Sequence, residues 1–291
     1  MRIAVASGKG GTGKTTVAVN LAVVAKEFIR EVQYVDCDVE EPNGHLFLKP
    51  WIKKTIPAVV LVPVIDGARC DLCGRCAEAC RFNALLVTKK NVLVFPELCH
   101  GCGACMIVCP YGAIKESTRE IGVIETGSAV VGENGFFNKN ISYRAGVLNV
   151  GEHMATPLVR SVKEKTFGKG ISIIDASPGT SCPVIEAVRD CDFVVLVTEP
   201  TPFGLSDLKL AVGMTKSLGL PLGIIINRSQ GIDDELMDYL TAENLTVVGE
   251  IPLKREIAEM ISRGQIVAIE DKPMKVVFEQ ILKMILDQKA T

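Results

Sequence analysis

The stretch RIAVASGKGGTGKTT, residues 2–16, decides the fold of this chain. Residues 2–6 form a short, mostly apolar run that predicts a buried strand. Residues 15–28 are apolar on most faces, which predicts a largely buried helix. The segment 8–15 fits the phosphate-loop pattern, which requires a strand before it and a helix after it. Its glycines let backbone N–H groups turn toward phosphate oxygens, and the helix N-terminus adds the positive end of a dipole. The stretch therefore predicts a nucleotide-binding α/β fold.

The loop contains two lysines, although a phosphate loop needs one. Lys14 is expected to reach the β and γ phosphates, and the Thr15 hydroxyl to hold Mg²⁺. Lys9 is either a solvated loop lysine or a second cation for phosphates. A glycine-rich turn without a ligand is the plain alternative, and the agreement of strand, loop and helix argues against it. The residues expected to bind the nucleotide here are Gly8, Lys9, Gly10, Gly11, Thr12, Gly13, Lys14, Thr15 and Thr16.

The rest of the chain alternates between strand-like and helix-like runs. This alternation predicts a mostly parallel sheet of about seven or eight strands with helices on both faces. A strand that ends in acidic residues is expected within 32–43, and an amphipathic closing helix within 274–288. The other expected strands lie within 123–134, 141–152, 170–180, 191–200, 220–229 and 245–252, with a helix within 204–218.

Eight of the eleven cysteines fall between Cys70 and Cys109. In a reducing compartment such clustering indicates metal ligands rather than disulfides. Residues 70–85, CDLCGRCAEACRFNAL, align with residues 99–114, CHGCGACMIVCPYGAI, at a constant offset of 29. A repeat of this kind inside an α/β chain predicts an inserted domain. The expected domains are an ATPase domain in two parts, 1–60 and 118–291, and an insert over 61–117.

The spacing CxxCxxCxxxC in both runs resembles that of bacterial two-cluster ferredoxins. In that family three closely spaced thiolates bind one cluster, and the fourth cysteine of each run binds the other. The resemblance implies a small α+β domain with two [4Fe–4S] clusters, although Arg81 stands where the pattern has proline. Zinc is the alternative that isolated CxxC pairs would leave open. The implied ligand sets are Cys70, Cys73, Cys76 and Cys109 for one cluster, and Cys80, Cys99, Cys102 and Cys105 for the other.

The position of Lys9 directly after the first glycine resembles the deviant phosphate loop of the MinD, ParA and nitrogenase iron-protein superfamily. Several later motifs resemble the same superfamily and occur in the same order. The resemblance implies a dimeric ATPase in which Lys9 reaches the partner's nucleotide. It also implies that Lys14 acts within its own chain and that Asp38 orients the attacking water. The matching motifs are VDCDVEEPN at 35–43, IIDASPGT at 173–180, IIINRS at 224–229 and EIP at 250–252.

The same resemblance assigns the remaining nucleotide contacts. Asn227 is expected to bond the base, which favours ATP over GTP, and Pro252 to pack near it. The N–H group of Gly179 is expected to touch the γ-phosphate. The residues expected to hold Mg²⁺, directly or through water, are Thr15, Asp36, Asp38 and Asp175.

The three cysteines outside the two runs have separate expectations. Cys37 and Cys191 flank apolar strands and are expected to be buried core thiols. Cys182 lies near the position where the nitrogenase iron protein carries one ligand of a cluster between subunits. A buried thiol or a thiol near the dimer interface is expected for Cys182, with a bridging cluster as the alternative.

Charge and hydropathy exclude some classes of function. The formal net charge is −2, so the chain lacks the electrostatic footprint of a nucleic-acid binder. No apolar run reaches membrane-spanning length and no secretory signal opens the chain, so a cytoplasmic protein is expected.

ATP-coupled electron transfer through the clusters fits best. An Mrp-type iron–sulfur carrier is the alternative, against which the lack of a CxxC after Cys109 counts. Either function needs a redox or cluster-accepting partner. MinD-like positioning fits less well, because few basic residues accompany the last helix.

Overall fold

The structure, a computed structural model, describes residues 1–131, 139–164, 166, 169–231 and 234–288. Within these residues nine strands form one sheet in the order β11-β10-β9-β1-β8-β2-β7-β6-β3, and two more form a small separate sheet. The strands of the large sheet are β1 (Arg2–Ala6), β2 (Val32–Cys37), β3 (Trp51–Ile65), β6 (Ile114–Val131), β7 (Lys139–Leu148), β8 (Ile171–Ala176), β9 (Phe193–Thr198), β10 (Leu222–Ser229) and β11 (Val247–Pro252).

The strands from β11 to β7 are all parallel, and helices cover both faces of this part. Asp36 pairs with Asp175 at the ends of β2 and β8, so acidic side chains meet at the carboxyl edge of the sheet. The helices of this body are α1 (Lys14–Phe28), α2 (Gly44–Leu48), α5 (Ala155–Lys163), α6 (Cys182–Val188), α7 (Pro202–Ser217), α8 (Asp234–Ala242), α9 (Arg255–Ser262), α10 (Val267–Glu270) and α11 (Lys272–Asp287).

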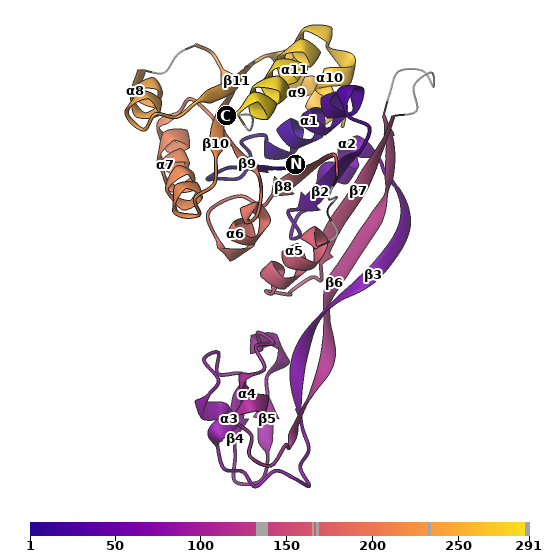
Figure 1. The fold of residues 1–291 in the computed structure, drawn as a ribbon, viewed down its shortest axis with the longest axis vertical. Helices are drawn as coiled ribbons and strands as arrows, with labels where there is room; N and C mark the ends of the chain where they lie inside the picture. Colours follow the sequence, from indigo (N-terminus) through magenta and orange to yellow (C-terminus); the bar gives the residue numbers. More distant parts are fainter. Residues whose placement is uncertain (132–138, 165, 167–168, 232–233, 289–291) are drawn as a thin grey trace.

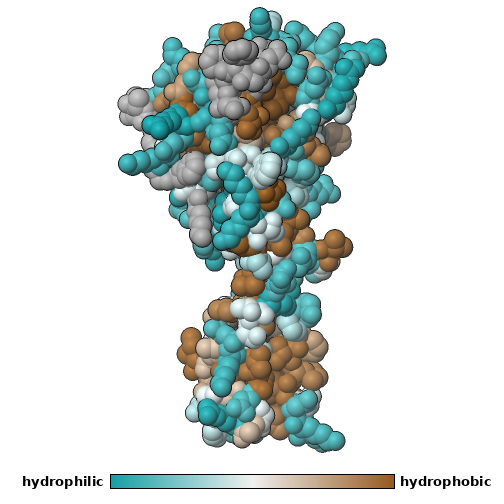
Figure 2. All heavy atoms as spheres, turned by 90° about the vertical axis from the view of Figure 1, so that its right-hand side faces the viewer, coloured by the Kyte–Doolittle hydropathy of each residue, from teal (hydrophilic) through white to brown (hydrophobic). Residues whose placement is uncertain are grey.

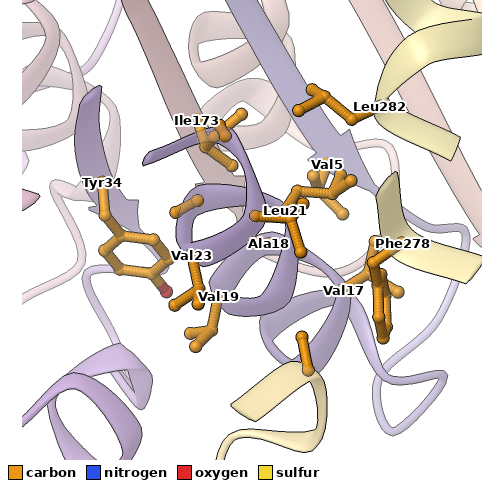
Figure 3. Close-up of a cluster of buried hydrophobic side chains, with 14 of the residues drawn as sticks. Val5, Val17, Ala18, Val19, Leu21, Val23, Tyr34, Ile173, Phe278 and Leu282 are labelled. Atoms are coloured by element: carbon orange, nitrogen blue, oxygen red, sulfur yellow. The ribbon is translucent and has the colours of Figure 1, made fainter. Parts of the chain in front are cut away.

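Helix α1 is buried at the centre of one core layer. Valine, alanine and leucine cover most of its faces, so it packs on both the sheet and the C-terminal helix. Leu21, Ile173 of β8 and Leu282 of α11 belong to the buried cluster around this helix (Figure 3). Asn20 fixes the arrangement, because its side chain accepts a hydrogen bond from the Ala268 N–H at 2.6 Å. Burial of this helix holds the phosphate loop rigidly at its N-terminus.

The last two strands of the sheet, β6 and β3, are antiparallel and extend beyond it as a twisted ribbon (Figure 1). Pairing of β6 with β7 ends at Gly122, opposite Leu148, while pairing of β6 with β3 continues to Ile114. The ribbon therefore leaves from the carboxyl edge of the parallel strands. An ion pair between Arg119 and Glu152 ties its base to the segment before α5.

The ribbon ends in the cysteine-rich part, which contains α3 (Arg75–Glu78), β4 (Leu85–Val87), β5 (Val92–Val94), the 3₁₀ turn Pro96–Leu98 and α4 (Ala104–Ile107). Its buried apolar residues are few, namely Cys76, Ala84, Leu85, Ala113 and Ile114, with partly buried neighbours. Hydrophobic residues are exposed over this lower part of the molecule (Figure 2). So few buried residues cannot stabilise a unit of this size well, and small units of this kind usually depend on disulfides or metals.

The mostly parallel α/β fold is confirmed, with one difference in the sheet. The ribbon of β3 and β6 adds two antiparallel strands, so the sheet is larger than expected and mixed at one edge. The strand expected within 123–134 forms the end of β6, and its residues 132–134 lie outside the described ones. The other expected strands and helices occur at their places. The helices in the described part of the chain are too short or too polar to span a lipid bilayer.

Candidate functional site

The phosphate loop joins β1 to α1 and requires glycine at two positions because other chain segments approach it closely. A Cβ atom at Gly8 would lie 2.1 Å from the backbone oxygen of Asp207 in α7. A Cβ atom at Gly13 would lie 2.3 Å from Nδ2 of Asn227, and Gly13 also has φ 95°, which favours glycine. The Asn227 amide donates to the carbonyl oxygen of Thr12 at 2.7 Å. Strand β10 therefore supports the loop directly.

Lys14 faces two carboxylates across the loop. Burial lowers the pKa of Lys14, and the charges of Asp175 and Asp38 oppose that shift. Burial raises the pKa of Asp175 to about 6, while hydrogen bonds from Thr15 and Tyr34 act in the opposite direction. Burial also raises the pKa of Asp38, against a hydrogen bond from the Ser177 side chain and the charge of Lys14. The structure thus brings the predicted Lys14, Thr15, Asp38 and Asp175 together.

Two polar atoms of this region lack hydrogen-bond partners although they are buried. They are the Thr12 Oγ1 and the Asp175 Oδ1. A buried oxygen without a partner is destabilising unless a ligand, an ion or water satisfies it. The unpartnered Asp175 oxygen, with the Thr15 hydroxyl beside this carboxylate, suits a hydrated Mg²⁺, whose ligands are oxygens. The donor set therefore fits the expected Mg²⁺–nucleotide complex.

Asp36 is hydrogen-bonded to the backbone of the acidic loop that follows β2. Its side chain is fully buried and accepts hydrogen bonds from the N–H groups of Asp38 at 3.2 Å and Gly44 at 3.0 Å. Burial and the neighbouring Asp175 raise its pKa well above the usual range. Asp36 thereby holds both ends of the acidic loop 38–44. Tyr34 supports Asp175 from the same strand, because its hydroxyl donates to Oδ2 at 2.8 Å.

The residues expected around the base and the γ-phosphate lie at the same edge of the sheet. The Asn227 amide nitrogen is held by its hydrogen bond to the Thr12 carbonyl. Pro252 ends the neighbouring strand β11. Beside them is a cavity of about 420 Å³, large enough for a nucleobase, which Glu199, Arg228 and Leu253 help to line. The Gly179 N–H donates to the Ser7 carbonyl at 2.9 Å, so a contact with the γ-phosphate would require this bond to be exchanged.

The cysteines of the two runs line two cavities in a crossed arrangement. The thiols in each set surround a hollow, and in the described part of the chain no three metal-binding side chains are placed to hold a single metal ion. One cavity is lined by Cys70, Cys73, Cys76 and Cys109. The other is lined by Cys80, Cys99, Cys102 and Cys105. Each cavity thus receives three cysteines from one run and the last cysteine from the other.

The backbone hydrogen bonds and conformations of the two cysteine runs repeat at the same offset as their sequences. The thiol sulfur of Cys80 accepts from the Ala84 N–H at 3.3 Å, and that of Cys109 accepts from the Ala113 N–H at 3.4 Å. Backbone N–H groups aimed at sulfur stabilise negative charge there, as suits a metal-bound thiolate. The left-handed residues repeat at the same offset of 29: Leu72 and Gly101, Gly74 and Gly103, Asn83 and Gly112.

The three remaining cysteines differ in exposure. Cys37 and Cys191 are buried, as expected, and Cys182 is exposed at the start of α6. Burial raises the pKa of the Cys191 thiol to about 11. His100, inside the second run, stacks on Phe82 of the first run with ring centroids 3.6 Å apart.

Comparison with known proteins agrees with this geometry. Residues 3–267 match the CobQ/CobB/MinD/ParA nucleotide binding domain. The chain belongs to this family. An uncharacterized protein of Methanocaldococcus jannaschii is 31% identical over 276 residues, covering 91% of this chain and 90% of that protein. The iron-sulfur cluster carrier protein of Aquifex aeolicus is 23% identical over 301 residues, covering 97% of this chain and 66% of that protein.

This CobQ/CobB/MinD/ParA family protein is also similar to a solved structure over most of its length, and to a polyferredoxin over a short segment. The Mg-ADP complex of the septum site-determining protein MinD from Pyrococcus horikoshii has a TM-score of 0.58 and 19% identity. The match covers 98% of this chain and 95% of the MinD chain. An alignment of 62 positions with 39% identity covers 17% of this chain and 15% of the polyferredoxin protein MvhB of Methanothermus fervidus.

Sequence reasoning missed several polar residues around the nucleotide site. Glu199 follows β9 and forms ion pairs with Lys9 and Arg228. Tyr34 contacts Asp175, and Ser177 contacts Asp38. A signal for Glu199 was present, because ligand sites of open α/β sheets lie at the carboxyl ends of the strands. The partners of Tyr34 and Ser177 depend on strand neighbours, which the sequence does not reveal.

Proposed function

We propose that this protein is an ATP-hydrolysing homodimer that couples its nucleotide state to electron transfer through two [4Fe–4S] clusters. Lys14 would bind its own chain's phosphates, and Lys9 the partner's. Asp38 would orient the attacking water, while Thr15 and Asp175 would hold Mg²⁺ and its water. The two crossed cysteine sets would bind the clusters, which supply one-electron chemistry when present.

The observation that carries the coupling is a contact between the acidic loop and the ribbon. The carbonyl of Val39, next to Asp38, accepts a hydrogen bond from the Leu148 N–H at 2.9 Å. Leu148 is the last residue of β7 and pairs with Gly122, where the ribbon leaves the sheet. The carbonyl of Ile121 on the ribbon accepts from the Asn149 N–H at 3.0 Å. Two steps of backbone hydrogen bonding therefore separate the nucleotide-sensing loop from the ribbon.

Side-chain packing strengthens this link. Val39 is fully buried, and its Cγ1 would lie only 2.7 Å from a Cβ atom at Gly146. The absence of a side chain at Gly146 lets Val39 pack directly on β7 beside Leu158 and Val162. Packed interiors transmit displacements rather than absorb them. A shift of Asp38 toward a nucleotide would therefore move the base of the ribbon, and with it the cysteine-rich part.

An iron–sulfur carrier function is the second candidate. It is favoured by the similarity over almost the whole chain to the Aquifex aeolicus carrier protein. The chain has no CxxC pair after Cys109, so it lacks the dimer-bridging pair expected of an Mrp-type carrier. The two functions differ in what leaves the protein, which is electrons in one case and clusters in the other.

Redox titration of the anaerobic protein tests the proposal. We expect the reduction potentials of the clusters to shift when ATP or a non-hydrolysable analogue binds, because the ribbon moves relative to the body. The Lys14→Ala variant, which should not bind nucleotide, is the control and should show no shift. Unchanged potentials in the unaltered protein, together with rapid cluster transfer to an apo-acceptor, would favour the carrier function.

A further inference from the structure

The carboxylate of Glu199 lies between two cations of its own chain. Its Oε2 is 3.7 Å from Lys9 Nζ, and its Oε1 accepts a hydrogen bond from Arg228 Nη1 at 2.7 Å. The Glu199 side chain is only 13% exposed, whereas those of Lys9 and Arg228 are 33% and 54% exposed. The phosphate-loop lysine is therefore held inside its own protomer by a poorly hydrated carboxylate.

The two contacts differ in strength. The Arg228 contact is short and has hydrogen-bond geometry, whereas the Lys9 contact is longer and is an ion pair alone. Arg228 directly follows Asn227 and adopts φ 55°, a left-handed backbone that non-glycine residues rarely adopt. A buried carboxylate without a cation is strongly destabilising. Because Arg228 remains at Glu199, Lys9 can leave without creating such an uncompensated charge.

We propose that Glu199 is a positioning residue that retains Lys9 until a partner's nucleotide attracts it. This inference rests on the proposed function, in which Lys9 acts on the partner's phosphates. Dimer formation then exchanges one ion pair, Lys9 with Glu199, for another, Lys9 with phosphate. Arg228 neutralises Glu199 throughout the exchange. Glu199 thereby raises the protein concentration at which ATP drives dimer formation.

The proposal predicts opposite effects for two conservative substitutions. Glu199→Gln removes the attraction on Lys9, so half-maximal ATPase activity should require about 2- to 5-fold less protein, the effect of a partly exposed ion pair. Arg228→Gln leaves Lys9 as the sole cation at Glu199. The protein concentration needed for half-maximal ATPase activity should therefore rise by a similar factor. A purely structural role of the Glu199–Arg228 pair would make both variants change in the same direction.

The test measures specific ATPase activity against protein concentration at saturating ATP, and sedimentation velocity with a non-hydrolysable ATP analogue. ATP affinity is measured separately, because Arg228 lines the cavity beside Asn227. Thermal unfolding verifies that each variant folds. Glu199→Asp keeps the charge but moves it away from Lys9. Its protein concentration at half-maximal ATPase activity should lie between those of the unaltered protein and Glu199→Gln.

Opposite shifts for Glu199→Gln and Arg228→Gln support the proposal, and any other combination overturns it. The Lys9→Ala variant distinguishes an error in the proposed retention of Lys9 by Glu199 from an error in the proposed cross-dimer role of Lys9. If Lys9→Ala dimerises and hydrolyses ATP normally, the cross-dimer role of Lys9 is wrong. If Lys9→Ala is inactive while Glu199→Gln behaves like the unaltered protein, only the retention by Glu199 is wrong.

Discussion

Lys9 and Lys14 belong to one loop but have different surroundings. Lys14 is buried against Asp175 and Asp38, whereas Lys9 is at the rim of the site beside Glu199. A buried cation between carboxylates is suited to hold phosphates within its own chain. A partly exposed cation at the rim, such as Lys9, is able to reach another molecule. We therefore expect substitutions of the two lysines to have separable effects on ATP binding and on ATP hydrolysis.

We expect Lys9→Ala to abolish ATP hydrolysis while leaving ATP binding mostly intact, because only the cross-dimer charge is lost. Lys14→Ala should lose binding itself, which makes it the matched control. Equilibrium binding of a fluorescent ATP analogue and phosphate release measure the two properties. Normal turnover in Lys9→Ala would contradict the assignment.

Thiol reactivity separates the three cysteines outside the runs. The thiolate is the reactive form, and a pKa of about 11 leaves roughly one Cys191 thiol in a thousand ionised at pH 8. Iodoacetamide at pH 8 should therefore modify the exposed Cys182 and spare Cys191 and Cys37 in the native protein. Peptide mapping by mass spectrometry locates the modification. Labelling of Cys191 as fast as Cys182 would show that the native structure opens there.

At the scale of elements, the ribbon is the distinctive feature. Its outer strand β3 contains Pro57 and Pro63, which cannot donate ladder hydrogen bonds and are tolerated because β3 is an edge strand. Its inner strand β6 has Gly122 where it leaves the body. A Cβ atom there would lie 2.3 Å from the Val147 carbonyl oxygen, so the close pairing depends on glycine.

Gly122→Ala should lower the free energy of unfolding by about 1–3 kcal/mol, because the added methyl group overpacks the base of the ribbon. The melting temperature should fall by roughly 5 °C. Gly213→Ala is the control, because a Cβ atom in that part of helix α7 meets nothing within 4 Å. That variant should unfold at the same or a slightly higher temperature. Equal melting temperatures for the two variants would argue against a tight ribbon base.

The crossed cysteine sets make a prediction about metal content. Anaerobically prepared protein should contain about eight iron atoms per chain if both cavities hold [4Fe–4S] clusters. Cys80→Ala should lose about four of them, because Cys80 lines the cavity of the second run. Metal analysis and electron paramagnetic resonance measure the content and the cluster type. Zinc, or four irons in the unaltered protein, would contradict two clusters.

At the scale of the whole molecule, the ribbon separates two units. The ends of the cysteine-rich segment are adjacent, because Ile65 pairs with Ile114 and the Asp66 N–H donates to the Ala113 carbonyl at 2.7 Å. The ribbon also leaves from the edge that carries the phosphate loop. A homodimer formed across that edge would therefore bring each ribbon alongside the partner.

Replacing residues 66–113 by a two-residue Asn-Gly turn should leave the body folded, since the flanking strands are already paired for a hairpin. We expect ATP affinity within about 2-fold of the unaltered protein, because the nucleotide site has no residue in this segment. Iron should be absent. Isothermal titration with ATP and circular dichroism test this, and loss of ATP binding would show that the segment supports the body.

The sequence alone determined the phosphate loop, the parallel α/β fold and the two cysteine runs, because each is encoded by residues close together in the chain. Glycine positions, apolar periodicity and cysteine spacing are local patterns. Only the tertiary structure decided the ribbon, the burial of Asp36 and the pairing of Lys9 with Glu199. Those features depend on which distant strands become neighbours: β3 pairs with β6, β2 pairs with β8, and the end of β9 lies beside the loop after β1. Local sequence does not specify such pairings.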